Sequence, residues 1–125
     1  MARAHETPDA HRLEPALAHL VAETMQALST PSRLRILGRL TQGPCGVTAL
    51  AADVGMQGSA VSHQLRVLRH LGLVVGRRDG RQVIYDLYDD HVAELLQQAI
   101  SHVQHLRLGQ AGRARPIPVG AGSAA

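Results

Sequence analysis

Residues 59–87, SAVSHQLRVLRHLGLVVGRRDGRQVIYDL, decide the fold of this chain, because they predict a helix followed directly by a β-hairpin. Val61, Leu65 and Leu68 recur at helical spacing and would form the buried face of the helix. Ser59 is the expected N-cap. With three apolar side chains turned inward, the polar and basic residues between them must face solvent.

The hairpin occupies residues 73–87, immediately after Gly72, which is expected to end the helix. Two β-rich runs are joined by Asp79 and Gly80, a pair typical of a two-residue type I′ turn. Three arginines lie next to this turn, at positions 77, 78 and 81. A basic hairpin directly after such a helix is typical of a wing, which can contact the backbone or minor groove of DNA.

A short helix is predicted before this stretch, at residues 47–54, with Gly55 ending it. A helix, a tight turn and a second helix form a helix-turn-helix. This unit inserts its second helix into the major groove of DNA, while arginines contact the phosphates. An ordinary charged surface helix is the alternative interpretation, and the wing argues against it. The expected DNA-binding residues are Gln57, Ser59, Ser62, His63, Arg66, Arg69, Arg77, Arg78 and Arg81.

Two further helices are predicted on the N-terminal side. Apolar residues from Leu13 to Leu28 follow the helical template, with Pro15 tolerated in the first turn. Thr30 and Pro31 then form an N-cap and first helical residue, and this helix should stop at residues 43–44, Gly-Pro. The expected fold class is therefore mainly α with a β-hairpin wing, a winged helix-turn-helix.

Composition limits the function classes. The chain has 125 residues, enough for one modest core, and dimerisation would help to stabilise it. The single cysteine, Cys45, excludes an internal disulfide and is expected to be a small apolar loop residue. Neither a membrane span nor a secretory signal is recognisable, so a cytoplasmic location is expected. No H-E-x-x-H or Ser-His-Asp spacing appears, so an enzyme is not expected.

The positive charge is concentrated. The net charge is +3 for the whole chain, whereas residues 57–81 hold five arginines and one acid, a net +4. There is no phenylalanine or tryptophan to stack on bases, which argues against single-strand binding by aromatic platforms. Double-stranded DNA is the expected partner.

The stretch 89–108, DDHVAELLQQAISHVQHLRL, predicts an amphipathic helix with histidines beside its apolar stripe. At about 100° per residue, His91, His102 and His105 fall within an arc of roughly 60°. Eleven residues of helix nevertheless put His91 about 16 Å from His102, too far for one ion. Two copies packed antiparallel would bring His91 of one level with His102 and His105 of the other. Asp89, in the turn before the helix, would complete four ligands, and Asp90 is the expected N-cap. The alternative interpretation is that the three histidines lie on a solvated flank of the helix and bind no metal.

These motifs together resemble the ArsR/SmtB metalloregulatory repressors: TPSRLRIL, SAVSHQLRVLRHLGLV, the RRDGRQVIYDL wing, and D-x-H with H-x-x-H. The resemblance covers roughly residues 13–108 and implies a winged-helix homodimer whose operator binding is controlled by metal held between paired C-terminal helices. It implies Asp89, His91, His102 and His105 as ligands. Members that sense arsenic or cadmium carry a cysteine pair before the recognition helix, and residues 50–54 here have none, which argues against thiophilic metals.

Carboxylate and imidazole ligands suit nickel, cobalt and zinc alike. The sequence is most similar to the nickel- and cobalt-sensing members, in which the N-terminal arm adds ligands, and His5 or His11 could do so here. Ni(II) or Co(II) is therefore preferred over Zn(II). A metal-independent winged-helix regulator controlled by a partner protein is the other alternative. The expected organisation is a disordered arm at 1–12, a winged-helix and dimerisation domain at 13–108, and a disordered tail at 109–125.

Overall fold

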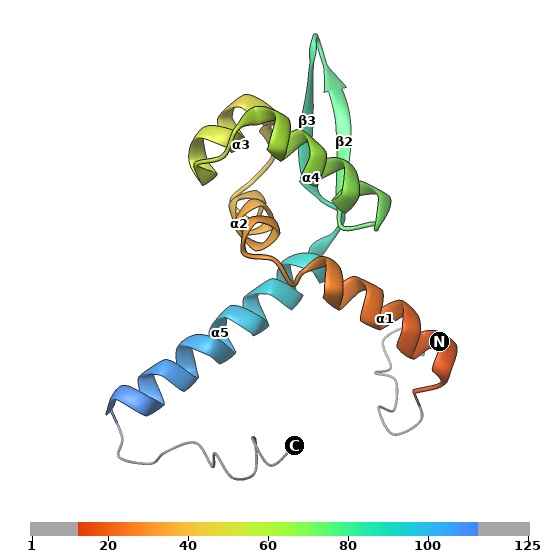
Figure 1. Ribbon diagram of the computed structural model, residues 1–125. Coiled ribbons are helices and arrows are strands. Elements are labelled where there is room, and N and C mark those ends of the chain that lie inside the picture. The colour runs from red at the N-terminus through yellow and green to blue at the C-terminus, as the bar shows by residue number, and fades with distance from the viewer. Residues whose placement is uncertain (1–12, 113–125) are drawn as a thin grey trace.

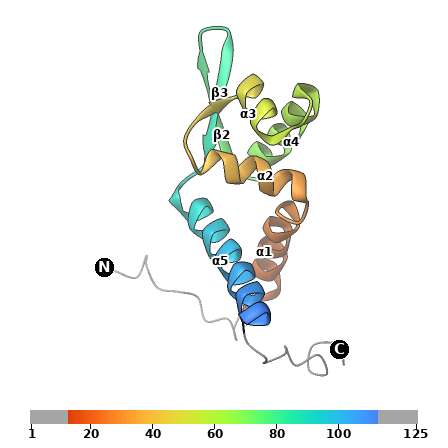
Figure 2. The ribbon, with the colours of Figure 1, turned by 90° about the vertical axis from the view of Figure 1, so that its left-hand side faces the viewer.

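The structure, a computed structural model, describes the backbone of residues 13–112 and the side chains of residues 13–109. The elements, in chain order, are α1 (Pro15–Ala27), α2 (Pro31–Leu40), β1 (Cys45–Gly46), α3 (Val47–Val54), α4 (Gly58–His70), β2 (Val74–Asp79), β3 (Gln82–Leu87) and α5 (Asp90–Gly112). Figure 1 shows a compact head made of α2, α3, α4 and the sheet, from which α1 and α5 extend as two arms. The two arms point in different directions away from the head in Figure 1, and in the view turned by 90° both lie below α2, on the side away from the wing (Figure 2).

The head is organised around one apolar core. Its most deeply buried side chains come from all three head helices and from β2: Ile36, Leu37, Leu40, Leu50, Val61, Leu65, Leu68 and Val74. Each large side chain removed from water in this way contributes roughly 1.5 to 3 kcal/mol. Val92 and Leu96, near the start of α5, also belong to the core, so α5 is anchored at its N-terminal end. The predicted inward face of α4 is confirmed.

The sheet has three strands rather than the two that the sequence predicts. Its order is β1-β3-β2 and both pairings are antiparallel, with Cys45 opposite Tyr85 in β1 and β3. Cys45 was expected to lie in a loop, but it is a buried residue of strand β1. A two-residue strand is too short to show a periodic pattern in the sequence. Its partner strand lies about 40 residues further along the chain, so no local signal predicts the pairing.

The turn of the wing also differs from the expectation. Asp79 pairs with Gln82, so the two loop residues are Gly80 and Arg81 rather than Asp79 and Gly80. Gly80 has φ 67°, and among the described residues no residue other than glycine has a positive φ. A type I′ turn requires positive φ at both central residues, so the type I′ prediction is wrong. Glycine at the first central position with positive φ is the pattern of a type II′ turn.

The start of α2 agrees with the sequence prediction, whereas the start of α4 and the end of α5 differ from it. The Thr30 hydroxyl accepts a hydrogen bond from the Arg33 backbone N–H at 3.3 Å, and Pro31 is the first residue of α2, as predicted. Ser59, in contrast, is not the N-cap of α4, because Gln57 occupies that position and Ser59 lies inside the first turn. α5 continues to Gly112, beyond the Leu108 end expected from the sequence. Among the described helices none is long and apolar enough to cross a membrane.

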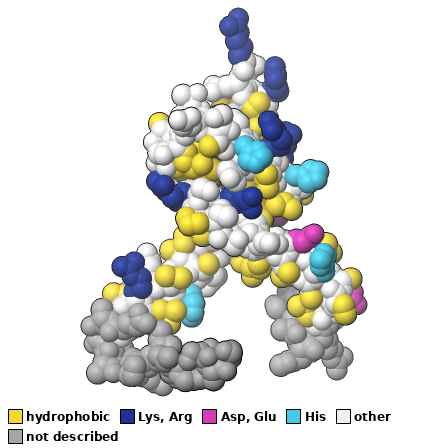
Figure 3. Space-filling model, in the orientation of Figure 1, with side chains coloured by type: hydrophobic (Ala, Val, Ile, Leu, Met, Phe, Trp, Pro, Cys, Tyr) yellow, Lys and Arg dark blue, Asp and Glu magenta, His cyan; other side chains and the backbone are white. Residues whose placement is uncertain are grey.

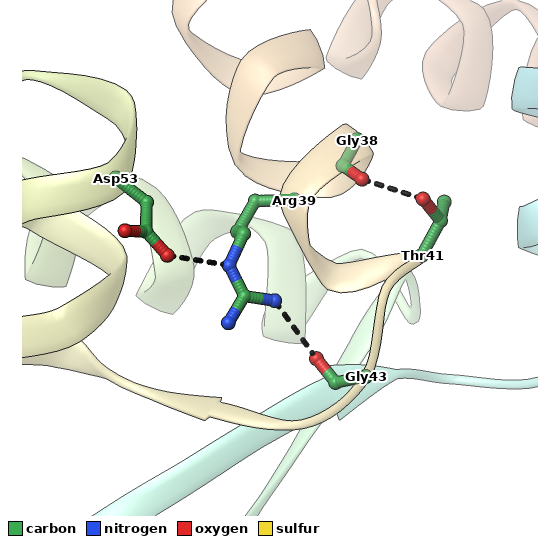
Figure 4. A network of polar contacts seen from close by, with 5 residues as sticks. All are labelled: Gly38, Arg39, Thr41, Gly43 and Asp53. Atoms are coloured by element: carbon green, nitrogen blue, oxygen red, sulfur yellow. Dashed lines mark hydrogen bonds and ion pairs between the residues drawn. The ribbon is translucent and has the colours of Figure 1, made fainter.

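Figure 4 shows how α2 is joined to α3. The Arg39 guanidinium donates through Nε to Asp53 Oδ2 at 2.6 Å and through Nη1 to the Gly43 carbonyl at 3.4 Å. The Thr41 hydroxyl donates to the Gly38 carbonyl and closes the last turn of α2. Arg39 therefore connects the end of α2, the loop that follows it and the first helix of the helix-turn-helix.

Candidate nucleic-acid interface and metal centre

The helix-turn-helix is formed by α3, a tight turn and α4. Gly55 ends α3 in the left-handed conformation, with φ 69°, where glycine avoids the steric cost that other residues meet. The Met56 N–H donates to the Ala51 carbonyl at 3.0 Å and closes the turn. Three residues separate α3 from α4, so the two helices pack directly against each other over the core.

The outer face of α4 carries the residues that the sequence predicts for DNA contact. Gln57, Ser59, His63, Arg66 and Arg69 are exposed, whereas Ser62 is partly buried. Gln57 and Ser59 lie at the N-terminal end of the helix, the end that meets base edges in a helix-turn-helix. The side chains are therefore free to approach a groove, and the arrangement matches the chemistry expected of a recognition helix.

The wing adds three cations beside this face. Arg77 and Arg78 lie on β2 and Arg81 lies in the turn, and all three are exposed. Figure 3 shows the basic side chains on the head and on the projecting wing, while hydrophobic side chains cover much of the two arms. Within residues 13–109, none of these three arginines forms an ion pair. Unpaired guanidinium groups on a projecting hairpin suit contact with phosphates.

Asp89 and His91 lie together at the start of α5. Asp89 Oδ1 accepts hydrogen bonds from the backbone N–H groups of His91 at 3.0 Å and Val92 at 3.4 Å. Asp89 is therefore the residue that caps α5, and the expectation that Asp90 would do so is wrong. Asp90 is the first residue of the helix, where its negative charge suits the positive end of the helix dipole.

The second oxygen of Asp89 faces the imidazole. Asp89 Oδ2 lies 3.2 Å from His91 Nδ1, and both side chains are accessible to solvent. This hydrogen bond lowers the pKa of Asp89 and raises the pKa of His91. One carboxylate thus caps the helix with one oxygen and presents the other beside a histidine nitrogen, which brings two of the four expected ligands together.

The other two expected ligands lie farther along α5. His102 and His105 are exposed and one turn apart, and the rise of the helix places His102 about 16 Å from His91. Within the described part of this single chain, no three histidine, cysteine, aspartate or glutamate side chains are close enough to hold a metal ion. His5 and His11, the additional ligands considered, lie outside the described residues.

Both arms carry apolar side chains that the chain itself leaves exposed. On α1 the side chains of Leu20 and Met25 are 59% and 53% exposed, and on α5 that of Val103 is 54% exposed. Such surfaces are typical of an association site. Within residues 13–109, the large apolar residues exposed on α1 and α5, together with Leu13 just before α1, are Leu13, Leu17, Leu20, Val21, Met25, Ile100, Val103, Leu106 and Leu108.

The helix-turn-helix, the basic wing and the core beneath them define a DNA-binding protein of the winged helix-turn-helix class. The model of the family described as "Bacterial regulatory protein, arsR family" matches residues 30–75, which run from the cap of α2 into β2. The HTH-type transcriptional regulator NmtR of Mycobacterium tuberculosis is 60% identical over 101 residues, covering 81% of this chain and 84% of that protein. The chain belongs to the ArsR/SmtB family of metal-responsive transcriptional regulators.

Solved structures agree with this fold. The solution structure of apo-NmtR superposes with a TM-score of 0.68 at 52% identity, covering 96% of this chain and 97% of that one. A homodimeric winged helix-turn-helix DNA-binding domain from Mycobacterium bovis superposes with a TM-score of 0.68 at 32% identity, over 79% of this chain and 91% of that one. The winged-helix fold class is confirmed, and so is the expectation that the protein is a regulator rather than an enzyme.

Proposed function

We propose that this protein is a repressor that binds operator DNA as a homodimer and whose operator affinity is controlled by Ni(II) or Co(II) held between paired α5 helices. The observation that carries the proposal is the pairing of Asp89 with His91 at the start of α5, on a helix whose exposed flank also bears His102 and His105. A DNA-binding regulator of this kind would work in the cytoplasm.

The exposed apolar residues of α1 and α5 support the homodimer. They lie on the two arms and away from α4 and the wing, so a partner covering them would leave the DNA-binding surface free (Figures 1 and 3). The related domain from Mycobacterium bovis is described as homodimeric. A twofold dimer also presents two recognition helices, which match the two half-sites of a palindromic operator.

The donor set fits a divalent metal of intermediate hardness. Asp89 has one oxygen left over from capping, and His91, His102 and His105 are accessible imidazoles. A bound ion would supply positive charge shared between two chains, and each chain would supply ligands from opposite ends of its helix. Cys45, the sole cysteine, is buried in β1 far along the chain from these residues, which supports imidazole-preferring metals over thiophilic ones. His5 and His11 would add the ligands that nickel prefers and tetrahedral zinc does not need.

DNA-binding titrations in the presence and absence of Ni(II), Co(II) and Zn(II) test the proposal. Because binding of metal and of DNA to one protein is reciprocal, operator DNA must change metal affinity by the same factor by which metal changes DNA affinity, typically 5- to 150-fold. A response to Zn(II) alone would favour the zinc-responsive alternative. Equal metal affinity of free and DNA-bound protein would favour a metal-independent regulator controlled by a partner protein.

A further inference from the structure

The recognition helix is held to the rest of the head by very little besides apolar packing. Val61, Leu65 and Leu68 pack into the core, where hydrophobic contact is not directional. Among the side-chain hydrogen bonds of residues 13–109, the bond from Arg33 Nε to Gln64 Oε1, at 2.7 Å, is the only one that joins α4 to another element. A directional bond of this kind can set the rotation of α4 about its own axis, which apolar packing alone defines less sharply.

The same guanidinium also reaches the end of α1. Arg33 Nη1 donates to the carbonyl oxygen of Ala27, the last residue of α1, at 3.4 Å. In a continuing helix that carbonyl would accept from the residue four positions later, but this residue is Pro31, which has no N–H. Ala27 is buried, so the Arg33 side chain provides a partner where the backbone cannot.

Arg33 is well suited to join the two helices. Its own backbone N–H is bonded to Thr30 at the start of α2, which holds the residue at the corner between α1 and α2. The guanidinium is planar and presents its donors in a rigid fork, so two acceptors bonded to it have a defined relative position. Both Arg33 and Gln64 are partly buried, which strengthens the bond relative to one in open solvent.

We infer that Arg33 is a positioning residue that fixes the orientation of the recognition helix relative to α1. This inference rests on the proposed function, because α1 carries part of the apolar surface expected to pair in the dimer. In such a dimer the two α1 helices are fixed to each other, and Arg33 transmits their geometry to each α4. Its effect is therefore on the separation and angle of the two recognition helices, and so on the half-site spacing that the protein selects.

The test uses the full-length protein and a DNA duplex selected from a random-sequence pool by the wild type. Copies of this duplex with one or two base pairs inserted or deleted between the half-sites report spacing preference. The variants are Arg33→Met, Gln64→Met and the double variant, each replacing a polar side chain with an unbranched apolar one of similar length. Thermal unfolding of each variant is measured alongside, as is the dependence of binding on salt.

Each single variant should weaken binding to the selected duplex about tenfold and flatten the preference among spacings, and the double variant should be little worse than either, because the two side chains act as one unit. The salt dependence should stay unchanged, since neither side chain is inferred to contact phosphate. If Arg33→Met unfolds, Gln64→Met still tests the inference, because Gln64 is partly exposed.

Three results would overturn the inference. The first is additive losses in the double variant, which would make Gln64 an independent DNA contact. The second is an unchanged spacing preference in Gln64→Met. The third is a reduced salt slope in Arg33→Met, which would make Arg33 a phosphate contact. Failure of the proposed function is distinguishable, because in that case the wild type itself would select no duplex with paired half-sites.

Discussion

Asp89 Oδ2 lies 3.2 Å from His91 Nδ1, while Oδ1 of the same carboxylate caps α5 through the backbone N–H of His91. Asp89 therefore has a structural role and a candidate ligand role, and each role uses a different oxygen. Substitutions can separate the two roles, because asparagine caps helices about as well as aspartate but has no charge and is a weaker metal ligand.

The first prediction concerns these two roles. At a pH above the raised pKa of His91, where the charged pair no longer contributes to stability, Asp89→Asn should keep the melting temperature close to that of the wild type and lose most of the metal affinity. Asp89→Ala should lower both, since alanine cannot cap the helix. Thermal unfolding and metal titration of the two variants provide the measurement. Equal melting temperatures for the alanine and asparagine variants would show that the cap contributes nothing.

The second prediction is the pH dependence of the Asp89–His91 pair. His91 has a raised pKa in the folded protein, so its contribution to stability is complete below the ordinary histidine pKa and is lost as pH rises through the raised value. Asp89 has a lowered pKa, so its contribution is present above the ordinary carboxyl pKa and is lost as pH falls through the lowered value. The pair should therefore stabilise the protein most between about pH 4 and 6.5.

The metal affinity, unlike the contribution of the pair to stability, should decrease at acidic pH. A ligand imidazole must lose its proton, so metal affinity should fall as pH drops through the raised pKa of His91. Nuclear magnetic resonance titration of His91 in the wild type and in Asp89→Asn measures the cause directly. The pKa of His91 should be lower in the variant, and an unchanged value would mean that Asp89 does not hold this imidazole in solution.

The third prediction concerns the basic surface. Arg66→Ala and Arg77→Ala should each weaken DNA binding without unfolding the protein, since both side chains are exposed. Loss of one phosphate contact per protomer should lower the magnitude of the salt slope by about one unit per protomer, or about two for the dimer. Arg107→Ala is the matched control, because it removes the same charge from α5 and should leave the slope unchanged.

The fold was largely predictable because local sequence patterns indicate most of its helices and strands. Periodic apolar residues, a Thr-Pro helix start and glycines at helix ends led to each of the five helices and to the two strands of the wing. The features that were not predicted either depend on pairing between distant parts of the chain or differ from the prediction by one or two residues. β1 exists only because β3 pairs with it, and the caps at Gln57 and Asp89 lie one or two positions before the residues expected.

The candidate sites divide in the same way. Asp89 and His91 are close in sequence, so their placement at the start of one helix could be foreseen. The Arg33–Gln64 bond spans 31 positions and joins residues whose types are ordinary for helix surfaces. Helical spacing predicts which face a residue occupies but not which residue of another helix it meets, so the only signal for this contact is three-dimensional.

The fourth prediction addresses the residues before α1. Deletion of residues 1–12 should lower Ni(II) affinity much more than Zn(II) affinity if His5 or His11 completes a site of more than four ligands. Parallel titrations of the two metals with the full-length and truncated proteins provide the measurement. Equal losses for both metals, or none, would remove these histidines from the site and make zinc the better assignment.

The last prediction tests whether the metal site forms between two chains. About 1.5 Å of rise per residue keeps His91 and His102 of one straight helix apart, so ligands at opposite ends of α5 can share an ion only if two helices run antiparallel. One variant, Asp89→Asn with His91→Ala, loses the N-terminal half-site but keeps the helix cap. The other, His102→Ala with His105→Ala, loses the C-terminal half-site.

Neither homodimer then has a complete site, but a mixed dimer does. In it, Asp89 and His91 of one protomer face His102 and His105 of its partner at one end of the helix pair, while the other end has no ligands. Two different affinity tags allow the mixed dimer to be purified, and metal analysis should find one tightly bound ion per mixed dimer and none in either parent. A mixed dimer that binds metal no better than its parents would show that the two half-sites do not combine, and His102 and His105 would then be surface histidines without a role in metal binding.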